Sequence, residues 1–486
     1  MKKVFILLVF TVLHFSSPSF AEAQINGKWL QDYEAMKKFM AEGYANLEWA
    51  RNDRKIDLAA LDKKTKEELS KAATDQEARQ ILENFLKTFR DGHLNLREVK
   101  ENPSQNSSNE PQSFAPDAAA DKVCSALGFR IRFNRFSLPF DQTPNFKLIS
   151  TAKDFFPAGV LTLENGKSYG ILRIGLFSSD GYFGNCTDSW EEFRSKLTES
   201  CKDGCINEFY RVADNRLSAK LTEQIRVLQK QKIDSLIVDI GGNGGGSNWV
   251  EAAARILSPK PLRSTSSGFI RHPHWVGILE DRLKDVSEDL ARKDLTASQK
   301  GYLKTAKSRL EQLIKEAKSP CDRTNFWTNE NVKKDCTLLN KTPANATGIF
   351  DYLPVKEIAN LKSKSILFTP GDYEYEESVF KGNLIVLVDA KTASAAENFA
   401  SLMQLNKSAK VIGETTLGAG CGYVNGGTKY FLPNSKLQLR MPDCVRYRAD
   451  GVNEVSGVEP DVVLWETSDD KQKRLEKLLS NLSKGN

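Results

Sequence analysis

The sequence is poor in the residues that usually build metal sites. Its 486 residues include only four histidines, and its eight cysteines form no C-x-x-C pair. Structural zinc sites draw their ligands from cysteines and histidines at short spacings. The sequence therefore argues against a zinc site and predicts a protein without a metal ion or other cofactor.

Signals for nucleotide or nucleic-acid binding are also missing. The glycine-rich run at residues 241–246 lacks the G-K-[ST] ending of a phosphate-binding loop and does not fit G-x-G-x-x-G in full. The 69 basic and 63 acidic residues are spread along the chain, whereas nucleic-acid binding favours a clustered basic face. We expect no nucleic-acid partner, and we expect the glycines to bring the backbone close to a substrate.

Long apolar runs are absent except near the start of the chain. Two lysines, an apolar run at residues 4–15 and a small-residue segment predict a secretory signal at residues 1–23. Cleavage is expected after Ala21 or Ala23, and the earlier site lowers the net charge from +6 to +4. No later run has the length of a spanning helix. The sequence predicts a periplasmic or secreted protein with no integral membrane segment after signal removal.

An even number of cysteines in an exported chain predicts disulfide bonds. The connectivity cannot be derived from the sequence. Local chain closure favours two pairs as first candidates, Cys321–Cys336 and Cys421–Cys444.

Hydrophobic periodicity predicts an α/β fold with a mainly parallel sheet. Strands are expected at 128–133, 147–149, 160–163, 168–175, 235–240, 365–368 and 383–388, and helices fall between the later ones. The expected divisions are a signal at 1–23, a helical domain at 24–91, a strand and disordered linker at 92–122, an α/β core at 123–277 and 341–466, a helical insertion with a disulfide loop at 278–340, and a final helix at 467–486. We expect the insertion to form a mobile cover over the candidate functional site, which is described next.

A buried strand at 384–388 runs through a short polar turn into a helix at 395–405. Ser394 lies at the junction, where its hydroxyl would project beyond the sheet with helix N-terminal amides beside it. This is a useful place for an acyl-transfer nucleophile. A plain helix-capping role for Ser394 is the alternative, because serine is a favoured cap residue. Glu397 is interpreted as a favourable charge in the first helical turn.

Four motifs in order carry a resemblance to a known family. They are VDIGGNGGG, KTASAAENFA, VIGETTLGAG and GVEPDVV. Together with the N-terminal FRDGHLNL, they resemble the superfamily of tail-specific (C-terminal processing) proteases, tricorn core protease and interphotoreceptor retinoid-binding protein. The resemblance covers most of residues 30–465 and implies a core like that of ClpP and crotonase. The interval from 97 to 167 is too short for the complete PDZ domain that the processing branch carries.

The resemblance implies roles for individual residues. Ser394 would be the nucleophile, and the oxyanion hole would come from the glycine turn, at Gly245 with Gly246 beside it, together with the Ala395 amide. The processing branch uses a lysine base at the position that is Ala419 here. The tricorn-like branch instead uses a histidine assisted by a late glutamate.

This chain offers the second arrangement, with His93 as base and Glu454 as its assistant. A serine precedes the histidine in tricorn, and Gly92 stands there in this chain. A lysine base at Lys391 stays open as an alternative, against its interpretation as an exposed turn residue. The resemblance is closer to the histidine-using branch.

The sequence thus predicts an exported serine endopeptidase that forms an acyl-enzyme and acts on a peptide or protein substrate. A serine hydroxyl needs a base to take its proton, and histidine can do this near neutral pH. The alternatives are a lipase or esterase, although the segment T-A-S-A-A lacks the G-x-S-x-G elbow, and a non-catalytic ligand-binding protein on the same fold. The sequence does not predict the oligomeric state.

Overall fold

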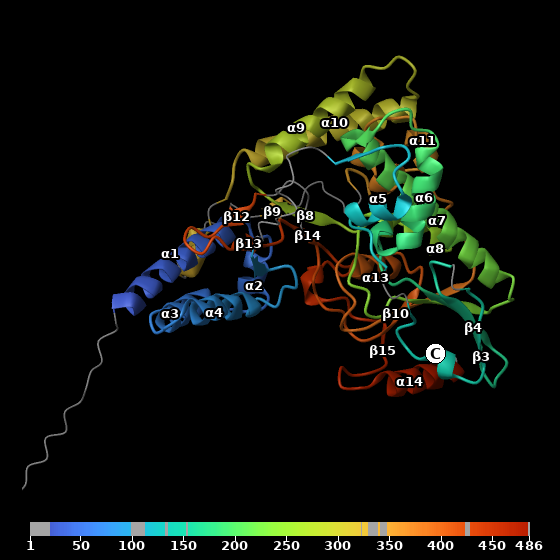
Figure 1. Cartoon of the computed structure of the whole chain (residues 1–486), viewed down its shortest axis with the longest axis horizontal. Helices are drawn as coiled ribbons and strands as arrows, with labels where there is room; N and C mark the ends of the chain where they lie inside the picture. Colours follow the sequence, from blue (N-terminus) through green and yellow to red (C-terminus); the bar gives the residue numbers. More distant parts are fainter. Residues whose placement is uncertain are drawn as a thin grey trace, which may run out of the picture.

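The structure is a computed structural model of the whole chain (Figure 1). It describes residues 20–98, 112–131, 135–151, 154–321, 323–328, 339–340, 348–422 and 428–484. Most of the predicted signal, residues 101–111 of the predicted linker, and Cys336 therefore lie outside the described residues. The two predicted cleavage positions fall at the start of helix α1 (Phe20–Gly43).

A seven-stranded sheet forms the centre of the fold. Its strands lie in the order β15-β11-β10-β7-β5-β4-β3, and the first five run parallel. The predicted α/β fold with a mainly parallel sheet is confirmed. The strands are β3 (Phe146–Leu148), β4 (Ala158–Thr162), β5 (Ser168–Arg173), β7 (Ser235–Asp239), β10 (Asn383–Val388), β11 (Lys410–Gly413) and β15 (Val462–Val463).

Helices cover both faces of this sheet, because the central strands present apolar side chains on each side. Leu236, Val238 and Val386 point into a cluster with one group of helices, and Ile237 and Leu387 point into a second cluster on the opposite face. The fold is therefore a three-layer sandwich. The first face is covered by α7 (Asp203–Gln229), α8 (Trp249–Leu257) and α13 (Ala395–Leu405), and the second by α14 (Lys471–Ser483).

The N-terminal helices pack outside the sandwich. After α1 come α2 (Leu47–Asn52), α3 (Leu58–Leu69) and α4 (Asp75–Lys87). Strand β1 (Asn95–Arg97) then pairs antiparallel with β13 (Gln438–Arg440), which in turn pairs with β12 (Tyr430–Phe431). This pairing brings the segment just after the helical region back to a late part of the chain.

The insertion packs against these N-terminal helices. Its helices α9 (Trp275–Leu290) and α10 (Ala297–Ala317) lie above the N-terminal helices and the sheet in Figure 1. Side chains of both regions belong to one hydrophobic cluster, which includes Tyr33, Phe85, Leu303 and Trp327. The described part of the insertion is thus part of a packed core, which argues against a mobile cover.

Two smaller units complete the described structure. Helices α5 (Ala120–Ala126) and α6 (Phe183–Arg194) are joined by the disulfide Cys124–Cys186. A short sheet of β14 (Cys444–Arg446), β8 (Ser267–Ile270) and β9 (Leu339–Asn340) lies between the N-terminal helices and the main sheet (Figure 1). Strand β14 reaches toward the site described below.

The strand predicted at 365–368 is wrong, because Lys364–Leu367 forms the short helix α12. The carboxylate of Asp289 on α9 accepts hydrogen bonds from the Ser363 N–H at 2.8 Å and the Ser363 hydroxyl at 2.7 Å. These contacts fix the residue before the helix. The predicted strand at 128–133 is reduced to one bridge between Ile131 and Tyr182, and its last two residues lie outside the described residues.

We expect Trp327→Ala to destabilise the fold without changing a residue of the candidate active site described below. The Trp327 side chain is buried, its indole N–H donates to the Lys37 carbonyl at 3.3 Å, and its ring lies 5.9 Å from that of Phe85. Truncating a buried tryptophan costs about 3–5 kcal/mol. Urea unfolding measures the change, with the exposed neighbour Thr328→Ala as control. Equal free energies of unfolding for the two variants would show that the insertion contributes little to this core.

Candidate active site

Two turns meet at the carboxyl edge of the sheet because β7 and β10 are paired, parallel neighbours. The turn after β10 bonds to the glycine-rich turn after β7. The Ala393 N–H donates to the Asn243 carbonyl at 2.9 Å, and the Gly242 N–H donates to Asp389 Oδ1 at 2.8 Å. The parallel pairing thus brings together Ser394 and the glycines, as the αβ alternation predicts.

Ser394 directly precedes α13 with an unusual backbone. Its φ of 55° and ψ of −116° lie outside the extended conformation that cap residues normally adopt. A non-glycine residue with positive φ carries strain of roughly 1–3 kcal/mol, and such strain gathers at functional sites. The capping alternative for Ser394 explains its position at the helix but not this strained backbone.

Glu397 holds that backbone in place. Its carboxylate is fully buried and accepts a hydrogen bond from the Ser394 N–H at 2.8 Å. The same carboxylate accepts from the Thr416 hydroxyl at 2.6 Å and from three successive amides, at Gly418, Ala419 and Gly420, at 2.7–3.1 Å. Glu397 is therefore more than a first-turn charge, because it ties the loop at 416–420 to the serine.

The glycine turn passes directly over Ser394. A Cβ at Gly245, where φ is 111°, would lie 2.8 Å from the Ser394 Cβ and 3.0 Å from the Ala395 nitrogen. A Cβ at Gly246, where φ is 144°, would lie 2.3 Å from the backbone of Phe177. Only glycine fits both positions. The Gly245 N–H donates to Asn243 Oδ1 at 2.8 Å, so this amide is engaged inside its own turn.

His93 reaches the same loop from the N-terminal region. Its Nδ1 lies 2.8 Å from the Ala419 carbonyl oxygen. A carbonyl only accepts hydrogen bonds, so Nδ1 carries the proton and Nε2 is the basic nitrogen of the neutral ring. A Cβ at Gly422 would lie 3.1 Å from Nε2, so glycine leaves space on that side. The half-buried imidazole therefore has the tautomer that a base needs.

Asp91 fixes the backbone that carries His93. Its buried carboxylate accepts from the His93 N–H at 2.9 Å, the Tyr44 hydroxyl at 2.9 Å and the Asn46 amide at 2.8 Å. Burial raises the pKa of Asp91, while these donors and His93 oppose the shift. The helical region thus contributes to the site through this carboxylate, and the Asn46 side-chain oxygen also accepts from Asn453, the residue before Glu454, at 2.8 Å.

Glu454 binds an arginine rather than the histidine. It is fully buried on the short 3₁₀ helix η5 (Glu454–Ser456), and its Oε2 accepts from Arg446 Nε at 2.7 Å. Its Oε1 is buried without a hydrogen-bond partner among the residues that the structure describes. In this structure the carbonyl of Ala419, and not Glu454, holds the imidazole, so the expected direct assistance of His93 by Glu454 is replaced by contact with Arg446.

Neither of the two positions considered for a lysine base carries a buried lysine. Ala419 is buried and contributes its backbone to Glu397 and His93. Lys391 is exposed on the turn before Ser394, in keeping with its interpretation as a turn residue.

A disulfide fastens the loop that carries these contacts. Cys421 follows the loop directly and is bonded to Cys444 on β14, as predicted. A further bond joins Cys201 and Cys205, and Cys321 is also disulfide-bonded, although its expected partner Cys336 lies outside the described residues. Disulfides of this kind are typical of oxidising compartments.

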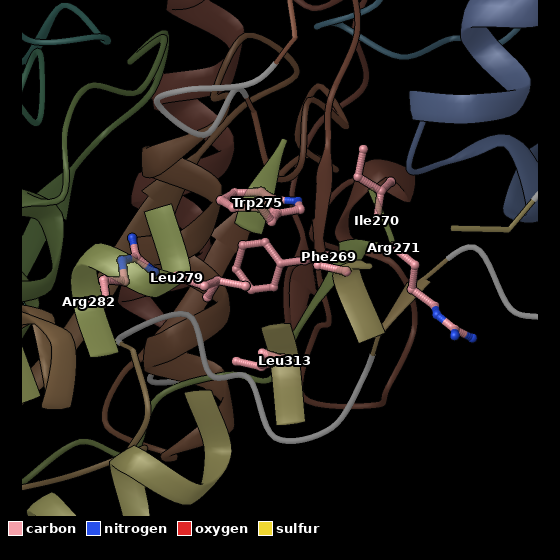
Figure 2. Close-up of a pocket in the computed structure, with 8 residues that line it drawn as sticks. Phe269, Ile270, Arg271, Trp275, Leu279, Arg282 and Leu313 are labelled. Carbon is pink, nitrogen blue, oxygen red and sulfur yellow. The ribbon is translucent and has the colours of Figure 1, made fainter. Parts of the chain in front are cut away.

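An apolar pocket lies between β8 and the helices α9 and α10. Figure 2 shows Phe269, Trp275, Leu279 and Leu313 around it, with the guanidinium groups of two arginines extending to opposite sides. Phe269 on β8 is paired with Cys444 on β14. No serine, cysteine, histidine or carboxylate is among the described residues that line this pocket.

We expect Glu454→Gln to flatten the pH dependence of stability. Burial raises the pKa of Glu454 from 4.5 to about 7, against the opposing effect of Arg446 and with a smaller contribution from Glu397. Between pH 4.5 and 7 the folded protein keeps a proton that the unfolded chain loses, so the free energy of unfolding falls as pH rises, by on the order of 3 kcal/mol.

Urea unfolding at several pH values measures this slope for the wild type and for Glu454→Gln. The exposed carboxylate variant Glu459→Gln is the matched control and should keep the wild-type slope. An unchanged slope in Glu454→Gln would show that Glu454 does not titrate in this window.

None of the helices that the structure describes combines the length and apolarity needed to cross a membrane.

Comparison with solved structures gives likenesses over nearly the whole chain. Mature CPAF is 14% identical with a TM-score of 0.56, covering 95% of this chain and 97% of that one. CPAF complexed with lactacystin is 15% identical with a TM-score of 0.56, covering 95% and 98%. A CPAF mutant is 15% identical with a TM-score of 0.57, covering 95% and 97%. At these identities the likeness shows a shared fold. The comparison with curated proteins gave no match.

A family model described as Peptidase family S41 matches residues 206–464, more than half of the chain. The matched span includes the glycine turn, Ser394, the loop that binds His93, and Glu454. This match confirms the resemblance that the four motifs carry. The chain belongs to Peptidase family S41 and is a serine-type peptidase.

Proposed function

We propose that this protein is an exported endopeptidase that cleaves peptide bonds through an acyl-enzyme on Ser394, with His93 as general base. The observation that carries the proposal is the pair of constraints on these two residues. Glu397 fixes the strained backbone of Ser394 and also binds the loop at 416–420. The Ala419 carbonyl of that loop fixes the His93 tautomer. One buried carboxylate thus joins nucleophile and base.

In the first half of the reaction, His93 Nε2 takes the hydroxyl proton as Ser394 Oγ attacks the substrate carbonyl. The imidazolium then returns that proton to the leaving amine, and the acyl group stays on Oγ. Water repeats the sequence to release the acid. The developing oxyanion is assigned to the amides of Gly246 and Ala395, since the Gly245 N–H is bound to Asn243. One such donor contributes roughly 3 kcal/mol.

The substrate is a peptide or a protein, as membership in a peptidase family implies. The predicted signal and the disulfides support a periplasmic or secreted location. The lipase or esterase alternative has no observation in its favour beyond the shared chemistry of acyl transfer.

Labelling with a fluorophosphonate tests the proposal and separates it from the non-catalytic alternative. The reagent phosphonylates an activated serine, so peptide mapping should place one adduct on Ser394. Prior denaturation should abolish labelling. Labelling at another serine, or none in a protein that hydrolyses casein, would contradict the assignment. CPAF has been solved in complex with lactacystin, so competition by lactacystin is a useful second readout.

A further inference from the structure

Arg446 lies where three parts of the site converge. Its Nη2 donates to the Ser394 carbonyl at 2.9 Å and to the Gly420 carbonyl at 3.1 Å. The same guanidinium forms an ion pair with Glu454 at 2.6 Å. The nucleophile turn, the His93-binding loop and η5 are thus joined by one nearly buried side chain.

The contact with the Ser394 carbonyl has a consequence for the next residue. A peptide unit is planar, and its C=O and N–H point in opposite directions. The groups that hold the Ser394 oxygen therefore set the direction of the Ala395 N–H. The Glu397 and Asn398 amides donate to this oxygen from within α13 at 3.0 and 3.1 Å, and Arg446 holds it from outside the helix at 2.9 Å. The Ala395 amide is one of the two proposed oxyanion donors. It lies close to Gly245, because a Cβ at Gly245 would be 3.0 Å from the Ala395 nitrogen.

Two further features fix Arg446 itself. Glu454 Oε2 accepts from Nε at 2.7 Å and forms the ion pair with Nη2, and the two contacts orient the planar guanidinium. Strand β14 is held by pairing with β8, where Arg446 lies opposite Ser267, and by the Cys421–Cys444 bond two residues away. Glu454 is therefore connected to the Ser394 carbonyl through Arg446.

We propose that Arg446 is a positioning residue that aims the Ala395 N–H at the oxyanion, with Glu454 as the group that orients it. The proposal rests on the function proposed above. It predicts a loss of transition-state stabilisation with little loss of substrate binding. A misalignment of about 1 Å in a catalytic group can cost 10²-fold.

Two variants of the full-length protein test the role. Arg446→Met combined with Glu454→Gln removes the arginine without leaving a buried charge. Arg446→Lys keeps the charge, but an ammonium cannot reproduce the planar fork. Arg448→Met is the matched control, since Arg448 lies two residues further on and donates to the Gly457 carbonyl at 2.7 Å instead of to the Ser394 turn.

The readouts are kcat, KM and the affinities of two ligands. One is a peptidyl aldehyde, which forms a tetrahedral adduct with the serine, and the other is the matching peptidyl alcohol, which cannot. The peptide part of both ligands is taken from a casein sequence that the wild type cleaves. We expect the double variant to lose about 10²-fold in kcat and in aldehyde affinity, with KM and alcohol affinity within about twofold. Arg446→Lys should lose about tenfold.

The outcomes separate the two proposals. Wild-type kcat and aldehyde affinity in a folded Arg446 variant would overturn the positioning role. Equal losses for aldehyde and alcohol, or failure of even Arg446→Lys to fold, would overturn it in favour of a purely structural role. If the wild type binds the aldehyde no better than the alcohol, the acyl-enzyme on Ser394 fails instead.

Discussion

Ser394→Ala is expected to abolish peptide hydrolysis while leaving the protein folded. The substitution removes one hydroxyl from a residue whose backbone is held by Glu397 at its N–H and by Arg446 at its C=O. Both contacts use only the main-chain atoms of Ser394, so alanine keeps them. Losses on removing the nucleophile of a serine protease reach about 10⁶-fold in kcat. Casein hydrolysis and fluorophosphonate labelling measure the effect.

The matched control is Ser401→Ala, which removes a buried hydroxyl from the same helix, α13. It should retain wild-type activity and a similar circular dichroism spectrum. Undiminished turnover in pure, folded Ser394→Ala would show that another residue is the nucleophile. The strained backbone of Ser394 would then need a different explanation.

The elements around the nucleophile could be predicted because their signals are local. The apolar run of β10 and the amphipathic pattern of α13 indicate a strand and a helix, and both occur at 383–388 and 395–405. Parallel pairing then brings the turn after β7 to the same edge. The predicted strand at 365–368 failed because a contact distant in sequence decided it, namely the bond from Ser363 to Asp289.

The groups that support the nucleophile were harder to find. The position of Glu397 in the first helical turn indicates a helix charge, and its place three residues after Ser394 also fits the S-x-x-E pattern of a capping box. Even that pattern indicates only one of its five hydrogen bonds. Arg446 has no local signal, since its contacts depend on how β14, the loop and η5 meet in space. For the same reason the partner of Glu454 could not be predicted.

His93→Ala should reduce kcat/KM by at least about 10³-fold, on the scale of base deletions in serine proteases. The ring is held by the Ala419 carbonyl and its backbone by Asp91, so its removal should leave the surrounding loop bound to Glu397. Lys391→Ala is the matched comparison and should have little effect, since Lys391 is exposed. Circular dichroism checks the folding of both.

The pH profile distinguishes the two kinds of base. A histidine base must be neutral to accept the proton, so kcat/KM should fall at acid pH, where a histidine base becomes protonated. A lysine base must also be neutral, and the ordinary lysine pKa is ~10.4. With a lysine base, kcat/KM would therefore begin to fall at a higher pH than with a histidine base. Because burial raises the pKa of Glu454 to about 7, the profile is repeated in Glu454→Gln, which should keep the imidazole limb and be less impaired than His93→Ala. Near-normal activity in folded His93→Ala, with the acid limb retained, would refute the histidine mechanism and return attention to a lysine.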